Sequence, residues 1–259
     1  MIEVNNLAVK TANKTLLEPL TFRIQKGESI GVLGESGAGK TMLTKALLQL
    51  LPSPLQVEGS VVVHDQDLNS SSNEQLRSIR GNVLGYIPQN VQAIFDPYRK
   101  IGVQMVEAIR AHERTTKREA KSTAIASLRE VQLRDEHYNF FPFQLSGGML
   151  QRAGIALVSS LQPELVIADE PTTALDEETK TVVLELLLRK QRDEGLSILF
   201  VSHEIDVIKK MATRILVLEN GKCVERGPAD QLFNDPSSSR LQSFLHYETV
   251  LQRGAMKND

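Results

Sequence analysis

The strongest constraint on this chain is a glycine-rich octapeptide that joins an apolar run, residues 29–33, to a helix-forming run, residues 42–48. Its residues are Gly34, Glu35, Ser36, Gly37, Ala38, Gly39, Lys40 and Thr41. Glycines let the backbone turn and approach a ligand closely, and the amide groups at a helix N-terminus attract anions. A lysine here reaches the outer phosphates of a nucleotide, and the next hydroxyl can ligate Mg²⁺. The octapeptide therefore predicts a nucleoside triphosphate site, with a glycine-rich turn carrying an exposed lysine as the alternative.

Length and charge narrow the class of protein. The 259 residues can bury a substantial core, as one large domain or as a domain with a subdomain. The net charge is −2 and no long basic tract occurs, so nothing favours a nucleic-acid partner and none is expected. Cys223 is the only cysteine, which excludes an intramolecular disulfide and cysteine-based metal clusters and fits a reducing cytoplasm.

The sequence contains no candidate for a membrane-crossing segment. Residues 1–6 lack a basic stretch followed by an apolar one, and no apolar run approaches the ~18 residues that span a bilayer. We therefore expect the chain to reach a membrane only through a protein partner.

Buried apolar stretches alternate with helix-forming stretches, which indicates an α/β fold with a mainly parallel sheet. Strands are predicted at 2–9, 20–24, 58–64, 164–169 and 197–202, with a hairpin of 215–219 and 222–225 across Asn220-Gly221. Helices are predicted at 102–111, 117–131, 177–192, 228–233 and 240–252. Helical spacing dominates residues 95–160, which predicts an all-helical insertion into the α/β core.

Two adjacent carboxylates end an apolar strand, where an α/β sheet places its ligands. Asp169 is suited to orient a triphosphate-bound Mg²⁺ through its waters, and Glu170 to polarise the attacking water. The alternative is an exposed acidic turn before Pro171. Together with the octapeptide, this pair of carboxylates predicts hydrolysis of the nucleoside triphosphate.

A second phosphate-seeking helix start follows Leu145, in the run to Arg152 that reads LSGGMLQR. Ser146 can cap the helix, and Gly147 and Gly148 expose its amide groups to an approaching anion. On spacing alone, an ordinary capped helix start explains these residues equally well.

These motifs, together with Gln89, the run 174–176 and the run 201–204, occur in the order found in the ATP-binding cassette subunits of ABC transporters, which the chain resembles over most of its length. The resemblance implies a P-loop NTPase core with a mainly parallel sheet, an N-terminal antiparallel β-subdomain and an inserted helical subdomain. It also implies one ATP-binding domain. Its parts are a core at 1–94 and 161–235, a helical signature subdomain at 95–160 and a C-terminal helix at 236–259.

The resemblance implies roles for single residues, with ATP and Mg²⁺ as cofactors. The implied catalytic residues are Glu170, His203 and Lys40. The implied nucleotide contacts are residues 34–41, Gln89, Ser146, Gly147, Gly148 and Asp176. The implied metal ligands are Thr41, Gln89 and Asp169. In the family the signature serine and glycines face the nucleotide of the other subunit, so two cassettes close over ATP. Alone, His203 reads more simply as a strand-end residue with a local hydrogen bond, and Asp176 as a helix N-cap.

Three runs, residues 147–152, 95–97 and 168–176, are similar to those of the dipeptide, oligopeptide and nickel importers, especially the nickel-import subunits. This implies a sister ATPase in a heterodimer, with a homodimer as the alternative, two membrane permeases, an extracytoplasmic solute-binding protein and a place on the cytoplasmic face of the inner membrane. The chain stops soon after residues 233–236, which favours the short nickel type over peptide-importer relatives. Near Thr11 it lacks the aromatic residue that usually stacks on adenine, a loss on the order of 1 kcal/mol.

Two other functions fit the motifs less well. A soluble cassette ATPase acting on ribosomes or DNA usually has tandem cassettes or a long coiled coil, and no sustained heptads separate Lys40 from Asp169. A nucleotide-binding regulator without turnover would not need Glu170 and His203. The transported solute stays open among nickel, another chelated metal and short peptides.

Overall fold

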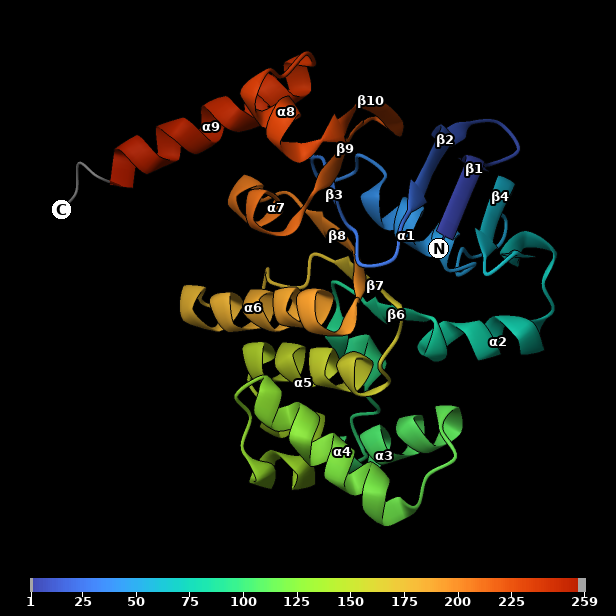
Figure 1. Ribbon diagram of the computed structural model, residues 1–259, viewed down its shortest axis with the longest axis vertical. Helices are drawn as coiled ribbons and strands as arrows, with labels where there is room; N and C mark the ends of the chain where they lie inside the picture. Colours follow the sequence, from blue (N-terminus) through green and yellow to red (C-terminus); the bar gives the residue numbers. More distant parts are fainter. Residues whose placement is uncertain (1, 256–259) are drawn as a thin grey trace. The chain divides into compact units, whose positions relative to one another are not determined.

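The computed structural model describes residues 2–255, with the backbone alone over 248–255 (Figure 1). The chain divides into two compact units. The first unit comprises Met1–Ser71 and Leu199–Asp259, and the second comprises Ser72–Ile198. Strands alternate with helices in both units, which confirms the predicted α/β class.

An antiparallel sheet forms the N-terminal part of the first unit. Its order is β2-β1-β4-β5, with bounds β1 (Ile2–Lys10), β2 (Thr15–Ile24), β4 (Gln56–Val63) and β5 (Gln66–Asp67). Leu20, Phe22 and Ile24 are buried while the residues between them are exposed, so one face of β2 covers the core. This is the predicted antiparallel β-subdomain, although β2 begins five residues before the predicted strand at 20–24.

The second sheet of this unit carries the phosphate-loop strand. The strands of that sheet within this unit are β3 (Ser29–Leu33), β9 (Arg214–Glu219), β10 (Lys222–Pro228) and β8 (Ser197–Ser202), which begins two residues before the unit boundary. β3 runs parallel to β9, and every residue of β3 is buried. Helix α1 (Lys40–Leu47) follows β3. Helix α7 (Ile205–Met211) packs on β3, because a Cβ at Gly31 of this strand would lie 2.8 Å from the Ile208 side chain.

The predicted hairpin is confirmed. Lys222 pairs with Glu219, and the turn residues Asn220 and Gly221 have φ of 49° and 80°, the left-handed values that a two-residue hairpin loop requires. The prediction that a helix starts at Pro228 is wrong, because this residue still pairs with Arg214 and only then caps α8 (Ala229–Asn234).

The C-terminal helix α9 runs over Ser239–Ala255, within the predicted segment 236–259. The last four residues of that prediction lie outside the described residues.

The second unit combines two parallel strands with helices. β6 (Leu84–Ile87) pairs in parallel with β7 (Leu165–Asp169), and α6 (Glu177–Glu194) follows β7. The predicted helical insertion is present as α3 (Ile101–His112), α4 (Lys117–Glu130) and α5 (Gly147–Ser160), with α4 packed beside both neighbours (Figure 1). The sequence did not predict α2 (Asn73–Asn82) or α7.

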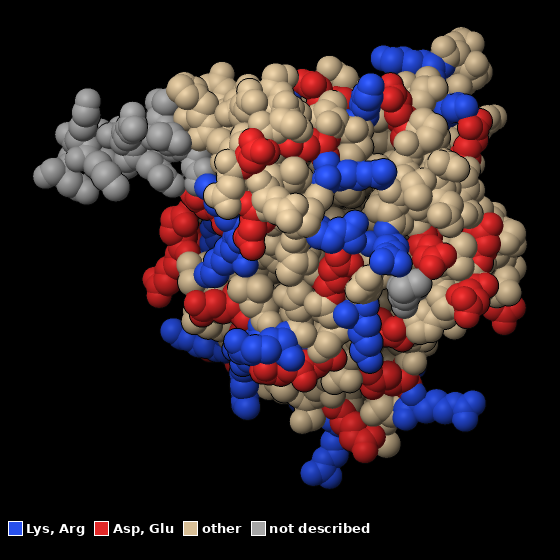
Figure 2. Space-filling view, turned by 45° about the horizontal axis from the view of Figure 1, so that its top comes forward, with Lys and Arg blue, Asp and Glu red and all other residues tan. Residues whose placement is uncertain are grey.

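Charge is mixed on the molecular face drawn in Figure 2, where basic and acidic side chains are interspersed. Over the described part of the chain, no helix is both long and apolar enough to cross a bilayer.

Candidate functional site

The phosphate loop belongs to the first unit and connects β3 to α1. Helix α1 begins at Lys40, and its N-cap Gly39 has φ of 104°, a conformation that disfavours any side chain. Gly37 also has a positive φ, 81°, and a Cβ placed there would meet nothing within 4 Å. Backbone conformation, and not packing within the chain, therefore accounts for glycine at position 37. The loop surface above it is open to a ligand.

Lys40 is held inside the loop. Its side chain is buried, and Nζ donates hydrogen bonds to the carbonyl oxygens of Gly34 at 2.7 Å and Glu35 at 3.0 Å. The following residue, Thr41, is exposed at the first turn of α1. An ammonium group, a hydroxyl and the amide groups of a helix start are thus placed together, a set of donors that suits phosphate oxygens.

The loop rests on the β9–β10 hairpin of the same unit. A Cβ at Gly34 would lie 2.7 Å from the carbonyl oxygen of Leu218, so the backbones are in close contact there. The amide of Gly221 donates to the carbonyl of Ala38 at 3.0 Å. These contacts fix both the first and the middle part of the octapeptide.

His203 also lies in the first unit, directly after β8, the neighbour of β3 in the sheet. Its side chain is exposed, and the next amide, that of Glu204, donates to the Ser202 hydroxyl at 3.0 Å. The histidine and the phosphate loop thus each follow one of two adjacent strands.

The second unit brings Gln89 and Glu170 together. Gln89 comes two residues after β6 and Glu170 one residue after β7, and these strands are parallel neighbours. The Gln89 side-chain amide donates to Glu170 Oε2 at 3.0 Å. Glu170 has φ of 49°, a left-handed conformation that is uncommon for a residue with a side chain and that is found preferentially at functional sites. Asp169 beside it is 1% exposed.

The LSGGMLQR run forms the start of α5 in this unit. The Ser146 hydroxyl accepts a hydrogen bond from the Met149 amide at 3.2 Å and caps the helix, so the simpler interpretation of this serine is confirmed. Gly147 is exposed, and a Cβ there would meet nothing within 4 Å. At Gly148 a Cβ would lie 3.4 Å from the carbonyl oxygen of Ala174.

Gln151 ties α5 to the segment that follows β7, and the sequence did not single it out. Its side-chain amide donates to the carbonyl of Pro171 at 2.9 Å, and the residue is 3% exposed. A glutamine within an apolar helical run is the available signal, because a buried amide requires a partner.

Asp176 is the N-cap of α6, as its simpler interpretation predicts. Its carboxylate accepts from the amide of Thr179 at 2.9 Å and from the Thr179 hydroxyl at 3.0 Å. The hydrogen bond from the Thr179 amide, followed by that from its hydroxyl, lowers the pKa of Asp176. Its capping contacts leave the side chain exposed.

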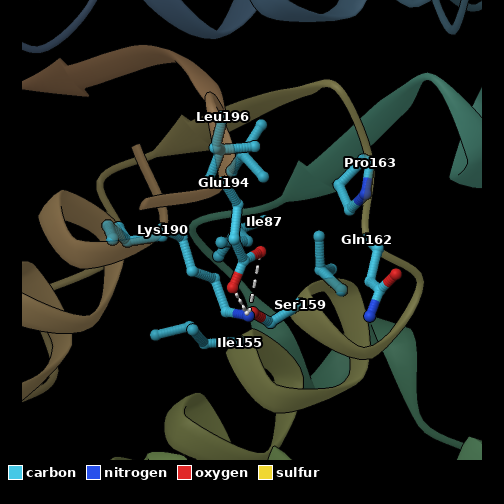
Figure 3. Close-up of a pocket in the computed structure, with 11 residues that line it drawn as sticks. Ile87, Ile155, Ser159, Gln162, Pro163, Lys190, Glu194 and Leu196 are labelled. Carbon is cyan, nitrogen blue, oxygen red and sulfur yellow. Dashed lines mark hydrogen bonds and ion pairs between the residues drawn. The ribbon is translucent and has the colours of Figure 1, made fainter. Parts of the chain in front are cut away.

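A small cavity in the second unit lies apart from these motifs. It is bordered by α5, α6 and β7, and Lys190 and Glu194 form an ion pair of 3.2 Å in its lining (Figure 3). Its volume is about 10 Å³, room for about one water molecule, so it does not accommodate a nucleotide.

No group of three or more histidine, cysteine, aspartate or glutamate residues that could hold a metal ion occurs among the described residues. The predicted Mg²⁺ ligands are instead divided, with the Thr41 hydroxyl in the first unit and Gln89 and Asp169 in the second. Mg²⁺ keeps several waters and is usually bound through one or two carboxylates plus substrate phosphates, so the few oxygen donors within each unit fit a metal that arrives with a nucleotide.

Known proteins are similar to this chain in both sequence and fold. The family described as ABC transporter matches residues 17–173. The metal-staphylopine import system ATP-binding protein of Staphylococcus aureus is 36% identical over 226 residues, covering 86% of this chain and 83% of its own length. The oligopeptide transport ATP-binding protein of Bacillus subtilis is 35% identical over 244 residues, covering 91% of this chain and 68% of its own length.

Among solved structures, a dimeric ATP-binding cassette in a post-hydrolysis state, bound to ADP and phosphate, has a TM-score of 0.79 to this chain. It is 26% identical in sequence, and the match covers 88% of this chain and 98% of that one.

Proposed function

The chain belongs to the ABC transporter family and is an ATPase, and from this premise we propose that it powers an importer of nickel or a related chelated metal ion. The general function, that of an ATPase subunit of an ABC importer, follows from the family and from relatives named for import. The chelated-metal assignment is supported by the relative named for metal-staphylopine import. A peptide importer is the second candidate, because other relatives are named for oligopeptide and D,D-dipeptide transport.

In this proposal the loop of the first unit binds the triphosphate. Its backbone amides and the start of α1 surround the phosphate groups, while Lys40 exchanges its bonds to Gly34 and Glu35 for the outer phosphates. His203, after the strand next to β3, contacts the terminal phosphate. Each of these groups offers a donor to an anion.

The second unit supplies the groups that activate water. Glu170 accepts the proton of the attacking water, and the Gln89 amide, 3.0 Å from its carboxylate, holds that carboxylate in place. Thr41, Gln89 and Asp169 would hold Mg²⁺, which when bound neutralises charge on the phosphates. The hydrogen bond between Gln89 and Glu170 is the observation that carries this assignment, because it brings together two motifs separated by 81 positions.

We further propose that the active unit is a pair of cassettes. The chain has one copy of each motif, and the exposed Gly147 has an open space where a side chain would fit, so packing within the chain does not require glycine there. Close approach of a nucleotide held by the second cassette explains it. The proposed assembly is a heterodimer with a sister ATPase under two permeases, at the cytoplasmic face of the inner membrane, supplied by a solute-binding protein.

Glu170→Gln tests the catalytic assignment. With the sister cassette present, ATP turnover should fall by roughly 10²–10⁴-fold, the usual contribution of a general base, while ATP binding is preserved. Glu178→Gln, an exposed glutamate in the first turn of α6, is the matched control and should keep its turnover. Unchanged turnover in Glu170→Gln would refute the assignment.

Uptake measurements identify the solute. Cells carrying Lys40→Ala should lose nickel uptake, and cells carrying Lys45→Ala, a change in the last turn of the same helix, should retain it. Loss of labelled dipeptide uptake with intact nickel uptake would overturn the metal proposal in favour of the peptide importer.

A further inference from the structure

The C-terminal helix reaches the phosphate loop through one arginine. Arg240, the second residue of α9, forms an ion pair with the carboxylate of Glu35, which is the second residue of the octapeptide. The same guanidinium group donates from Nε to Glu219 at the end of β9, at 2.8 Å. Arg240 therefore links three segments of the first unit that are far apart in sequence.

Hydrogen bonds fix the start of α9, the helix that carries Arg240. Ser237 and Ser238, which precede α9, donate to Glu225 of β10 from their amides at 2.8 Å and 2.9 Å and also from their hydroxyls. Glu225 is 7% exposed, so this anchor lies inside the unit. The Ser238 hydroxyl also accepts from the Leu241 amide at 3.1 Å and so fixes the first turn of α9.

Glu35, which Arg240 contacts, is also hydrogen-bonded to Lys40. The carbonyl of Glu35 is one of the two acceptors that hold Lys40 Nζ, at 3.0 Å. Residues 35–37 are exposed, whereas the arginine is 23% exposed and lies between two carboxylates. An arginine held by two carboxylates is well oriented, because its planar group offers several donors in a fixed geometry.

We propose that Arg240 is a positioning residue for nucleotide binding. By holding the Glu35 side chain, it keeps the first part of the phosphate loop in the conformation that presents Lys40 to a triphosphate, and it makes nucleotide affinity depend on the placement of α9. The inference rests on the proposed assignment of residues 34–41 to ATP. Arg240 itself need not touch the nucleotide.

A double-mutant cycle tests this mechanism. Arg240→Gln and Glu35→Gln should each raise the KM for ATP about three- to thirtyfold, the range expected for one coupled charged contact, with little change in kcat. Because both variants break the same link, the double variant should be no worse than either single variant. Arg240→Lys, which keeps the charge, should restore part of the affinity.

Arg214→Gln is the matched control. This arginine also pairs with a carboxylate of the first unit, Glu28 at 2.9 Å, and donates to the Arg23 carbonyl. Both partners lie outside the octapeptide, so the KM of this variant should not change. Multiplicative effects of Arg240→Gln and Glu35→Gln, or an unchanged KM with a lowered melting temperature, would reduce Arg240 to a structural role. An inactive wild-type pair of cassettes would instead refute the proposed function itself.

Discussion

Asp176 caps helix α6 and still leaves its carboxylate exposed to solvent. The amide and the hydroxyl of Thr179 hydrogen-bond to its carboxylate and lower its pKa. A lowered pKa in the folded state means that the charged form stabilises the protein. That contribution is complete above the pKa of the unfolded chain and disappears as the pH falls through the lower, folded value.

Asp176→Asn is therefore expected to change the pH dependence of stability. Asparagine still caps the helix but carries no charge, so the wild type should be more stable above about pH 4 and lose this advantage in more acidic solution. Urea denaturation between pH 2 and pH 7 measures it. Since the side chain is exposed, added salt should shrink the difference. A constant difference across this range would contradict the mechanism.

For single residues, the sequence predicts their chemical roles better than it predicts which other residues they contact. Glu170 was predicted because it follows an apolar strand, and Gln89 was predicted from the family resemblance; the structure joins them by a hydrogen bond. The contact of Arg240 with Glu35 spans 205 positions and follows no local pattern. No periodicity or motif in the sequence pairs a residue of the last helix with the phosphate loop.

Among the elements, two helical glycines have opposite surroundings. A Cβ at Gly102 in α3 would lie 2.1 Å from the ring of Tyr138, whereas one at Gly147 in α5 would meet nothing within 4 Å. Gly102→Ala should therefore destabilise the protein by about 1–3 kcal/mol through overpacking. Gly147→Ala should stay within about 0.5 kcal/mol of the wild type. Chemical denaturation of the isolated chain gives both values.

The same pair of variants separates packing from activity. Gly147→Ala should fold normally yet lose ATP turnover with the sister cassette, because the added methyl group occupies the space proposed for the nucleotide of the other subunit. Gly102→Ala, once folded, should keep its turnover. Full turnover in Gly147→Ala would show that the glycine has no role between cassettes.

Elements with strong apolar patterns were predicted, and those without one were not. Helix α2 is mostly polar, and its only local signal is the capping box that Ser72 forms with Gln75. Helix α7 has seven residues, too few for a helical repeat to stand out. Strand β2 was predicted too short because Pro19 interrupts its pattern, yet β2 is an edge strand of its sheet, where proline is tolerated.

At the scale of the whole molecule, ATP should stabilise the chain independently of its hydrolysis. The proposed phosphate loop lies in the first unit and Glu170 in the second, so binding and water activation depend on different parts of the chain. A ligand present at 100 times its Kd stabilises the folded state by about 2.7 kcal/mol. For a chain of this size that corresponds to a rise of roughly 5–10 °C in Tm.

Three proteins with MgATP make this measurable by thermal unfolding. The wild type and Glu170→Gln should show a similar rise in Tm, because Glu170 acts on water and contributes little to affinity. Lys40→Ala should show almost none, while Lys45→Ala on the same helix responds like the wild type. If Lys40→Ala kept the full rise, the anion site could not be the loop of the first unit. A rise missing from Glu170→Gln alone would mean that the second unit carries most of the binding energy, because the only group changed would be a carboxylate that follows β7.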